Sequence, residues 1–129
     1  MRVLLDTHAW LWLLSAPKRI ESSTLRVLES PDNELYLSAV SSWEIVIKHA
    51  TKKLDLPGAP AELMPEWMET TDVRILSIDF GHTLDVASLP LHHRDPFDRM
   101  LIAQSRIEDM PIVTRDPAFD AYDVEVIRA

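Results

Sequence analysis

Residues 2–7 of the chain read Arg-Val-Leu-Leu-Asp-Thr, and this short stretch decides the fold class. The apolar run from Val3 to Leu5 favours a strand that is covered on both faces, as strands of parallel sheets are. Asp6 ends the run, and residues 8–14, His-Ala-Trp-Leu-Trp-Leu-Leu, have the composition of a buried helix. An acidic residue at the carboxyl end of a central parallel strand stands where open α/β sheets bind ligands. A lone Asp there is more often only the cap of the next helix, so Asp6 needs partners before it indicates a site.

The composition of the 129-residue chain is that of one globular domain, residues 1–129. Hydrophobic residues make up 47% of the chain, which argues against a disordered protein. The absence of cysteine excludes disulfides and thiolate chemistry and fits a reducing compartment. No apolar stretch approaches the ~20 residues that cross a bilayer, and Asp6 interrupts the first apolar run too early for a signal peptide. We therefore expect a soluble, cytoplasmic protein with no membrane partner.

The formal net charge of −8 restricts the ways in which the chain could meet nucleic acids. Proteins that coat nucleic acids carry an excess of Lys and Arg, so a general coating protein is not expected. An acidic enzyme can still reach phosphates through metal ions that clustered carboxylates hold. A basic partner protein is the other interpretation, and the charge by itself leaves both open.

Strand and helix patterns alternate along the rest of the chain. Further strands are expected at residues 34–38, 73–78, 112–114 and 124–127, and helices at 24–29 (capped by Ser22 or Ser23), 41 to about 53, 79–88 and 96 to about 108. Apolar strands separated by helices predict a three-layer α/β fold: a central parallel sheet of about five strands with helices on both faces.

The helix expected from Ser41 has three features that the sequence alone suggests. Ser41 and Glu44 have the spacing of a capping box. An apolar stripe follows, made of Trp43, Val46, Ile47 and Ala50. A basic cluster lies towards the helix end and is expected to be a solvated face, with RNA contact as the less favoured alternative: Lys48, His49, Lys52 and Lys53.

Residues 54–72 show the weakest pattern. Pro60 can start a helix, and Pro65 is expected to kink or restart it. Leu63, Met64, Trp67 and Met68 recur at helical spacing and are expected to be ordinary core, with a partner-binding groove as the alternative.

Four acidic residues are expected at one edge of the sheet, where strands end and helices begin: Asp6, Glu44, Asp98 and Asp116. Asp6 and Asp116 follow the first and fourth strands. Glu44 and Asp98 each come three residues after a capping residue, where backbone dipoles favour the ionised carboxylate by about 0.3–1 kcal/mol. The cap before Asp98 is Asp95, with Pro96 as the first helical residue.

Each acid alone has a structural explanation as a cap or a turn residue, but four acids converging by chance on one edge is less expected. Their mutual repulsion would be costly without a cation between them. A site with only oxygen donors suits Mg²⁺ or Mn²⁺, which would keep several waters and bind phosphate oxygens. The arrangement predicts metal-assisted phosphodiester hydrolysis by activated water, which leaves a 3′-hydroxyl and a 5′-phosphate.

Four short motifs carry a family resemblance. They are LLDTH at residues 4–8, SSWEI at 41–45, HRDPFDRMLIAQ at 93–104 and VTRD at 113–116. Each is a weak signal by itself, but the four in this order, in a chain of this length, resemble the PIN-domain ribonucleases. In particular, the chain is similar to the VapC-like toxins of prokaryotic toxin–antitoxin pairs.

The resemblance implies a PIN-like fold and an Mg²⁺- or Mn²⁺-dependent endoribonuclease that is usually a homodimer. It further implies inhibition of translation or growth, restrained by a cognate antitoxin, which we expect to place an Arg in the acidic pocket. By position, the acidic site carries over to Asp6, Glu44, Asp98 and Asp116. Thr7 and Thr114 are candidate supporting hydroxyls. Asp95 is assigned to the cap, with a supporting role in the site as the alternative. The candidate RNA contacts are His92, His93, Arg94, Arg99 and Arg115.

Three alternatives remain at this stage. A Mg²⁺-dependent phosphatase or phosphoacceptor domain fits poorly, because position 8 is His where a haloacid dehalogenase needs Asp, and no lysine follows Lys53. Metal-free RNA cleavage would use His92 and His93 as acid and base, although adjacent residues point in different directions. A non-catalytic module would use the acidic edge to hold a basic partner and would need no metal.

Overall fold

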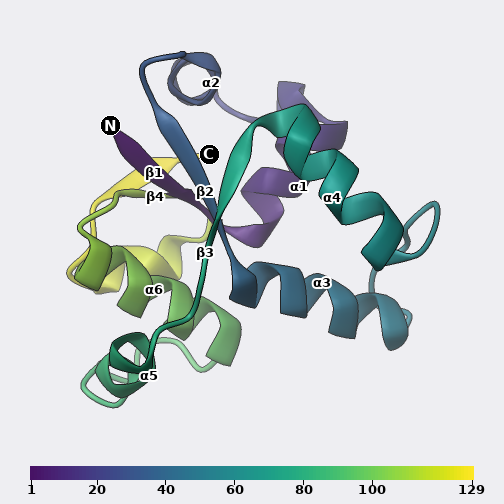
Figure 1. Cartoon of the computed structure of the whole chain (residues 1–129). Coiled ribbons are helices and arrows are strands. Elements are labelled where there is room, and N and C mark those ends of the chain that lie inside the picture. Colours follow the sequence, from purple (N-terminus) through teal and green to yellow (C-terminus); the bar gives the residue numbers. More distant parts are fainter.

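The fold is built on one sheet of five parallel strands in the order β3-β2-β1-β4-β5, seen in the computed structural model of residues 1–129 (Figure 1). The strands are β1 (Arg2–Leu5), β2 (Glu34–Ser38), β3 (Val73–Leu76), β4 (Ile112–Thr114) and β5 (Val126–Arg128). Strand β1 lies in the centre, with Leu5 in register with Leu37 of β2 and Val113 of β4. The predicted sheet is confirmed, although β3 ends two residues before Ile78 and β5 begins at Val126 instead of Val124.

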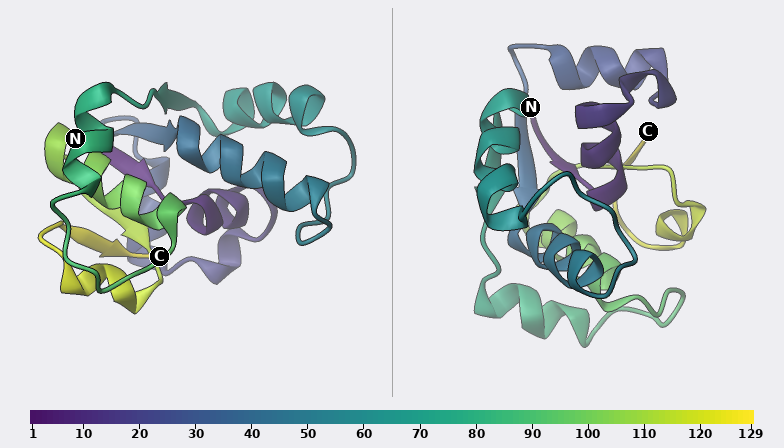
Figure 2. Two further views of the ribbon diagram at one scale, coloured as in Figure 1. Left: turned by 90° about the horizontal axis from the view of Figure 1, so that it is seen from below. Right: turned by 90° about the vertical axis from the view of Figure 1, so that its right-hand side faces the viewer.

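Helices cover both faces of the sheet. They are α1 (Thr7–Ser15), α2 (Ser22–Glu29), α3 (Ala39–Ala50), α4 (Pro60–Thr71), α5 (Phe80–Val86) and α6 (Pro96–Glu108), with short 3-10 turns η1 (Pro17–Arg19) and η2 (Pro117–Ala121). Val3 and Leu5 face a core completed by α1, α2 and α4, whereas Leu4 faces a second core built mainly by α6, α5 and η2. Figure 2 shows these helix layers on opposite sides of the strands. Burial on both faces explains why β1 is an unbroken apolar run.

Helix α3 starts earlier than the sequence predicts, and the capping box at Ser41 and Glu44 is wrong. The cap is Ser38, whose hydroxyl accepts a hydrogen bond from the backbone N–H of Val40 at 3.0 Å. Because β2 ends at Ser38 and the helix begins at once, Glu44 is the sixth helical residue and not the third. The helix ends at Ala50, before Lys53, and Lys52 follows in a left-handed conformation with φ 60°.

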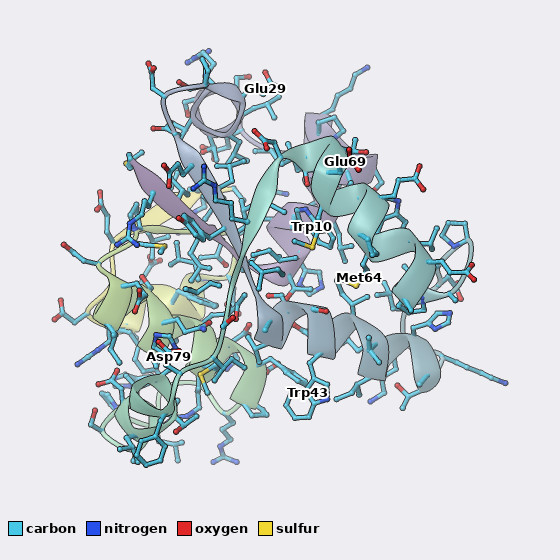
Figure 3. The ribbon with its side chains drawn as sticks, viewed as in Figure 1. Trp10, Glu29, Trp43, Met64, Glu69 and Asp79 are labelled. Carbon is cyan, nitrogen blue, oxygen red and sulfur yellow. The ribbon has the colours of Figure 1, made fainter.

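The expected apolar stripe of α3 is also wrong. Trp43 is 58% exposed and Val46 is 44% exposed, and Figure 3 shows the Trp43 side chain pointing away from the body of the molecule. The buried face instead carries Val40, Ser41, Glu44 and Ile45. A carboxylate can take a place on a buried helix face only when other groups of the fold hydrogen-bond or neutralise it.

Two other helix predictions need correction. Neither Ser22 nor Ser23 caps α2, because the helix already begins at Ser22 and Glu21 stands at the cap without a side-chain hydrogen bond. Helix α4 runs through Pro65 without a restart. Its core prediction is confirmed: Met64 is buried, and Trp67 and Met68 pack against the first core. No helix of the structure combines the length and apolarity of a membrane span.

Candidate active site

The site is organised by the carboxyl ends of β1 and β4. Asp6 follows β1 and caps α1, where its Oδ1 accepts a hydrogen bond from the Ala9 backbone N–H at 2.7 Å. The Asp6 N–H donates to the Val113 carbonyl at 3.0 Å, which extends the β1–β4 pairing to this point. Asp116 follows β4 and caps η2 through a 2.9 Å bond from the Ala118 N–H. Asp6 and Asp116 therefore cap helices, as their structural explanation predicts, and also lie at the candidate site.

Glu44 enters the site from α3 and is nearly fully buried. Its Oε1 accepts a 2.7 Å hydrogen bond from the Thr7 hydroxyl, and its Oε2 forms an ion pair with Lys48 one turn later. The hydrogen bond to Glu44 is the largest cause of a raised Lys48 pKa. The prediction that Lys48 belongs to a solvated basic face is therefore wrong, because packing of α3 against α1 turns that side of the helix towards the acids.

Asp98 enters from the first turn of α6, as predicted. Asp95 caps the helix, accepting hydrogen bonds from the backbone N–H groups of Phe97 at 2.8 Å and Asp98 at 3.3 Å. The Oδ2 of Asp98 lies 2.8 Å from Nε2 of His93, and the Oδ2 of Asp116 lies 3.4 Å from the same nitrogen. One imidazole thus bridges two acids that lie on different elements.

The fold holds His93 in this place through its backbone and its second ring nitrogen. Its N–H donates to the Tyr122 hydroxyl at 2.8 Å, and its carbonyl accepts from Nη1 of Arg99 at 3.2 Å. The Asp95 N–H donates to Nδ1 of His93 at 3.4 Å, so Nδ1 acts as an acceptor and Nε2 carries the ring N–H. His93 therefore donates towards the carboxylates of Asp98 and Asp116.

The electrostatics of the site reflect crowding of acids. Burial first, and then the neighbouring Asp95 carboxylate, raise the pKa of Asp98 to about 7, while His93 opposes this shift. Glu44 and Asp6 add smaller repulsive contributions, so three of the four predicted acids, Asp6, Glu44 and Asp98, interact electrostatically. Burial also raises the pKa of Asp6, against hydrogen bonds from Thr114 and Ala9.

The other basic candidates lie in different surroundings. Arg99 donates to three backbone carbonyls of residues 86–90, to the His93 carbonyl and to Tyr122, so it braces the loop before α6 and does not present a free guanidinium to RNA. The ring of His92 packs on Tyr122 with centroids 5.3 Å apart and makes no hydrogen bond or ion pair with the acids. Arg94 is exposed and lines an apolar groove, whereas Arg115 stands beside Asp116.

The residues fit a divalent cation. The ligand atoms of Asp98, Asp116 and His93 lie within 4.8 Å of one another, and Asp6 and Glu44 add negative charge that burial makes costly. Oxygen donors of this kind are those preferred by Mg²⁺ and Mn²⁺. The role of His93 at the acids is the main feature that the sequence missed. The only signal for it was its position two residues before the Asp95 cap.

Comparisons with known proteins agree with this geometry. The PIN domain family profile matches residues 3–125. Over 62 residues the chain is 34% identical to Ribonuclease VapC16 of Mycobacterium tuberculosis, a match that covers 48% of this chain and 44% of that protein, so it spans less than half of the curated relative.

Solved structures match over almost the full length. VapBC2 of Rickettsia felis, solved with a DNA fragment from its promoter, gives a TM-score of 0.75 at 12% identity, covers 99% of this chain and 98% of its own, and shows the fold alone. FitAcB of Neisseria gonorrhoeae gives a TM-score of 0.62 at 25% identity, with coverages of 98% and 96%. The match of the family profile to nearly the whole chain, together with this fold, shows that the chain belongs to the PIN domain family.

Proposed function

We propose that this protein is an Mg²⁺- or Mn²⁺-dependent endoribonuclease and the toxin of a toxin–antitoxin pair, acting against translation or growth. The PIN domain and the similarity to Ribonuclease VapC16 support nuclease chemistry. The observation that carries the proposal is the convergence of Asp98 and Asp116 on one point, with the carboxylates of Asp6 and Glu44 nearby. A raised Asp98 pKa is the expected mark of a site that lacks enough positive charge of its own.

The mechanism assigns different tasks to the four acids. A bound divalent ion would supply a water nucleophile at neutral pH and neutralise charge on the phosphate. Asp98 and Asp116 would hold the ion together with Asp6, which the β1–β4 pairing holds at the cavity that Asp116 also lines. Glu44 has both carboxylate oxygens engaged by Thr7 and Lys48, and this ion pair compensates a buried carboxylate. His93 donates its Nε2–H to the acids and so orients them.

The proposed partners are an RNA substrate, an antitoxin and a second copy of this chain. The VapBC structures are complexes of proteins similar in fold, one of them on promoter DNA. An antitoxin that inserts an Arg between the carboxylates would match the excess negative charge. Large apolar side chains on α3, α5 and the following loop are strongly exposed, among them Trp43 at 58%, Phe80 at 78% and Leu91 at 70%. Burial of these side chains in a homodimer would remove them from water.

The test is incubation with structured RNAs in the presence of Mg²⁺, Mn²⁺ or EDTA. We expect cleavage only with a metal, products with 3′-hydroxyl and 5′-phosphate ends, and no cleavage by Asp98→Asn. Detection of 2′,3′-cyclic phosphate ends would refute metal-activated water and support cleavage by histidine. A metal titration without binding would instead favour the non-catalytic acidic module.

A further inference from the structure

Two arginines share one tryptophan at the rim of the acidic site. Arg115 directly precedes Asp116, and Arg19 ends η1. The Cζ of Arg115 lies 4.4 Å from the centroid of the Trp12 ring, and the Cζ of Arg19 lies 4.7 Å from it. The folding of η1 against the β4–η2 connection thus places two guanidinium groups on an indole of α1.

A cavity of about 340 Å³ connects this cluster with the acids. Its lining combines two of the proposed metal-binding carboxylates with cationic and aromatic groups: Asp6, His8, Trp12, Arg115 and Asp116. Ligand pockets have volumes of about 300–1,000 Å³, and a cavity at the small end of this range suits a fragment the size of one nucleotide.

The two arginines differ in what holds them. Nε of Arg115 donates to the Ala129 carbonyl at 3.1 Å, and its Nη2 donates to the Arg19 carbonyl. These bonds explain Arg115 as an anchor of the chain end and of η1. Arg19 is exposed, and its guanidinium makes no hydrogen bond and no ion pair within the chain, so only the contact with Trp12 orients it. Such a contact leaves all five N–H donors of the guanidinium available to a phosphate.

The net charge of the molecule suggests a function for Arg19 and Arg115. The chain carries a formal net charge of −8, and its site concentrates four carboxylates, so it repels a polyanion. A metal ion at Asp98 and Asp116 offsets that repulsion only for the phosphate that it contacts. The neighbouring phosphate needs its own cation. Arg115 lines the same cavity, and Arg19 contacts the ring of Trp12, which also lines it.

We propose that Trp12, Arg19 and Arg115 form a subsite for the backbone phosphate next to the cleaved bond of single-stranded RNA. The inference rests on the nuclease function proposed above and adds where the substrate strand passes. Arg115 supplies a fixed guanidinium, Arg19 a free one, and Trp12 holds both at the rim.

The test uses a fluorescein-labelled RNA oligonucleotide and the non-cleaving Asp98→Asn protein as the common background. Adding Arg19→Gln should raise the Kd measured by fluorescence anisotropy about five- to tenfold at low salt. The slope of log K against log salt should become shallower by about 0.7, the value for one single-strand phosphate contact. Arg19→Lys should restore part of the affinity.

Arg26→Gln is the matched control, because Arg26 is also exposed, lies on α2 and makes no hydrogen bond or ion pair. It should leave both Kd and slope unchanged, and the melting temperature of Arg19→Gln should equal that of its background. The subsite is refuted if Arg19→Gln behaves as Arg26→Gln does, and cleavage by the parent protein would then still uphold the nuclease function. If the parent protein neither binds nor cleaves RNA, both proposals fall.

Discussion

At the scale of single residues, the site depends on which groups compensate the charge of each carboxylate. Glu44 has Thr7 and Lys48, whereas Asp98 and Asp116 share one N–H of His93. A hydrogen bond to a carboxylate favours the charged form and fixes its orientation, so these partners decide which oxygens are left for an ion. His93 is therefore a positioning residue whose contribution can be separated from that of a ligand.

Replacement of His93 tests this distinction. We expect His93→Ala to weaken Mn²⁺ binding about tenfold, as loss of a hydrogen-bond partner of metal ligands does. His93→Gln can donate an amide N–H from a similar place and should recover most of the affinity, measured by isothermal titration calorimetry. His92→Ala is the control and should bind Mn²⁺ as the parent does. Equal losses in the Ala and Gln variants would contradict N–H donation and identify the ring nitrogen as a ligand.

The raised pKa of Asp98 makes the stability of the metal-free protein depend on pH. The folded-state pKa of about 7 exceeds the ordinary value of 3.8, so the folded state holds a proton that the unfolded state has released. Stability from this group is fully present below about pH 4 and is lost as pH rises towards 7. We therefore expect the melting temperature of Asp98→Asn in EDTA, relative to that of the parent, to increase as pH rises from 5 to 8. The increase should be about a few degrees.

The neighbouring Asp95 provides the contrasting variant. Asp95→Ala removes the cap of α6 and should cost about 0.5–2 kcal/mol of stability, yet it should keep the rise in melting temperature that Mg²⁺ or Mn²⁺ produces in the parent. Asp98→Asn should lose most of that rise. The assignment of the two aspartates is reversed if the metal-dependent shift disappears in Asp95→Ala and persists in Asp98→Asn.

At the scale of elements, the start of α3 shows how a strand end can override a local cap signal. Ser38 is fully buried at the end of β2 and caps the helix, whereas the Ser41 hydroxyl is buried inside α3 without a hydrogen-bond partner. The chain turns into the helix as soon as the β2 pairing ends, which moves Glu44 to the sixth position and turns it towards Thr7.

The two serines should therefore respond in opposite ways to removal of the hydroxyl. Ser38→Ala should lower the free energy of unfolding by about 0.5–2 kcal/mol through loss of the cap. Ser41→Ala removes a buried hydroxyl without a partner and should be neutral or slightly stabilising. Urea denaturation of both variants measures the difference. A larger loss in Ser41→Ala than in Ser38→Ala would restore the capping box at Ser41 and Glu44.

At the scale of the whole molecule, the exposed apolar surface of α3, β3 and α5 distinguishes this side of the protein. A groove of about 520 Å³ opens there, lined by six apolar side chains together with Arg94 and Arg99: Val40, Trp43, Ile78, Val86, Leu91 and Met100. Exposed large apolar side chains gathered on one side of a protein favour association with another protein surface. We assign this groove to the contact surface of the proposed homodimer.

Trp43→Glu tests the dimer. Because Trp43 is 58% exposed, the substitution should leave the monomer folded but bury a charge in the dimer contact, and so raise the dimer dissociation constant at least tenfold. Analytical ultracentrifugation measures the change. Ile107→Glu is the control, since Ile107 is 46% exposed but lies near the end of α6 and does not line the groove. A monomeric parent protein, or an unchanged dimer in Trp43→Glu, would contradict the proposal.

The sequence by itself determined the sheet, the alternation of strands and helices, and the edge at which Asp6, Asp98 and Asp116 gather. These features depend on local information: the apolar run of β1, the helix signals between strands, and the rule that parallel strands end at the same edge. The Asp95 cap of α6 was equally predictable, because its N–H partners are two and three residues away.

Only the tertiary structure decided how these acids are compensated. The hydrogen bond from Thr7 to Glu44 joins residues 37 positions apart, and Arg115 reaches the carbonyl of Arg19 over 96 positions. The packing of helix faces against one another determines three features: the orientation of the His93 ring, the position of Lys48 next to Glu44, and the exposure of Trp43. Hydrophobic periodicity could not predict these contacts. A polar side chain is stable in a buried position only when it has a hydrogen-bonding partner, and that partner is often distant in sequence and is brought close only by tertiary packing.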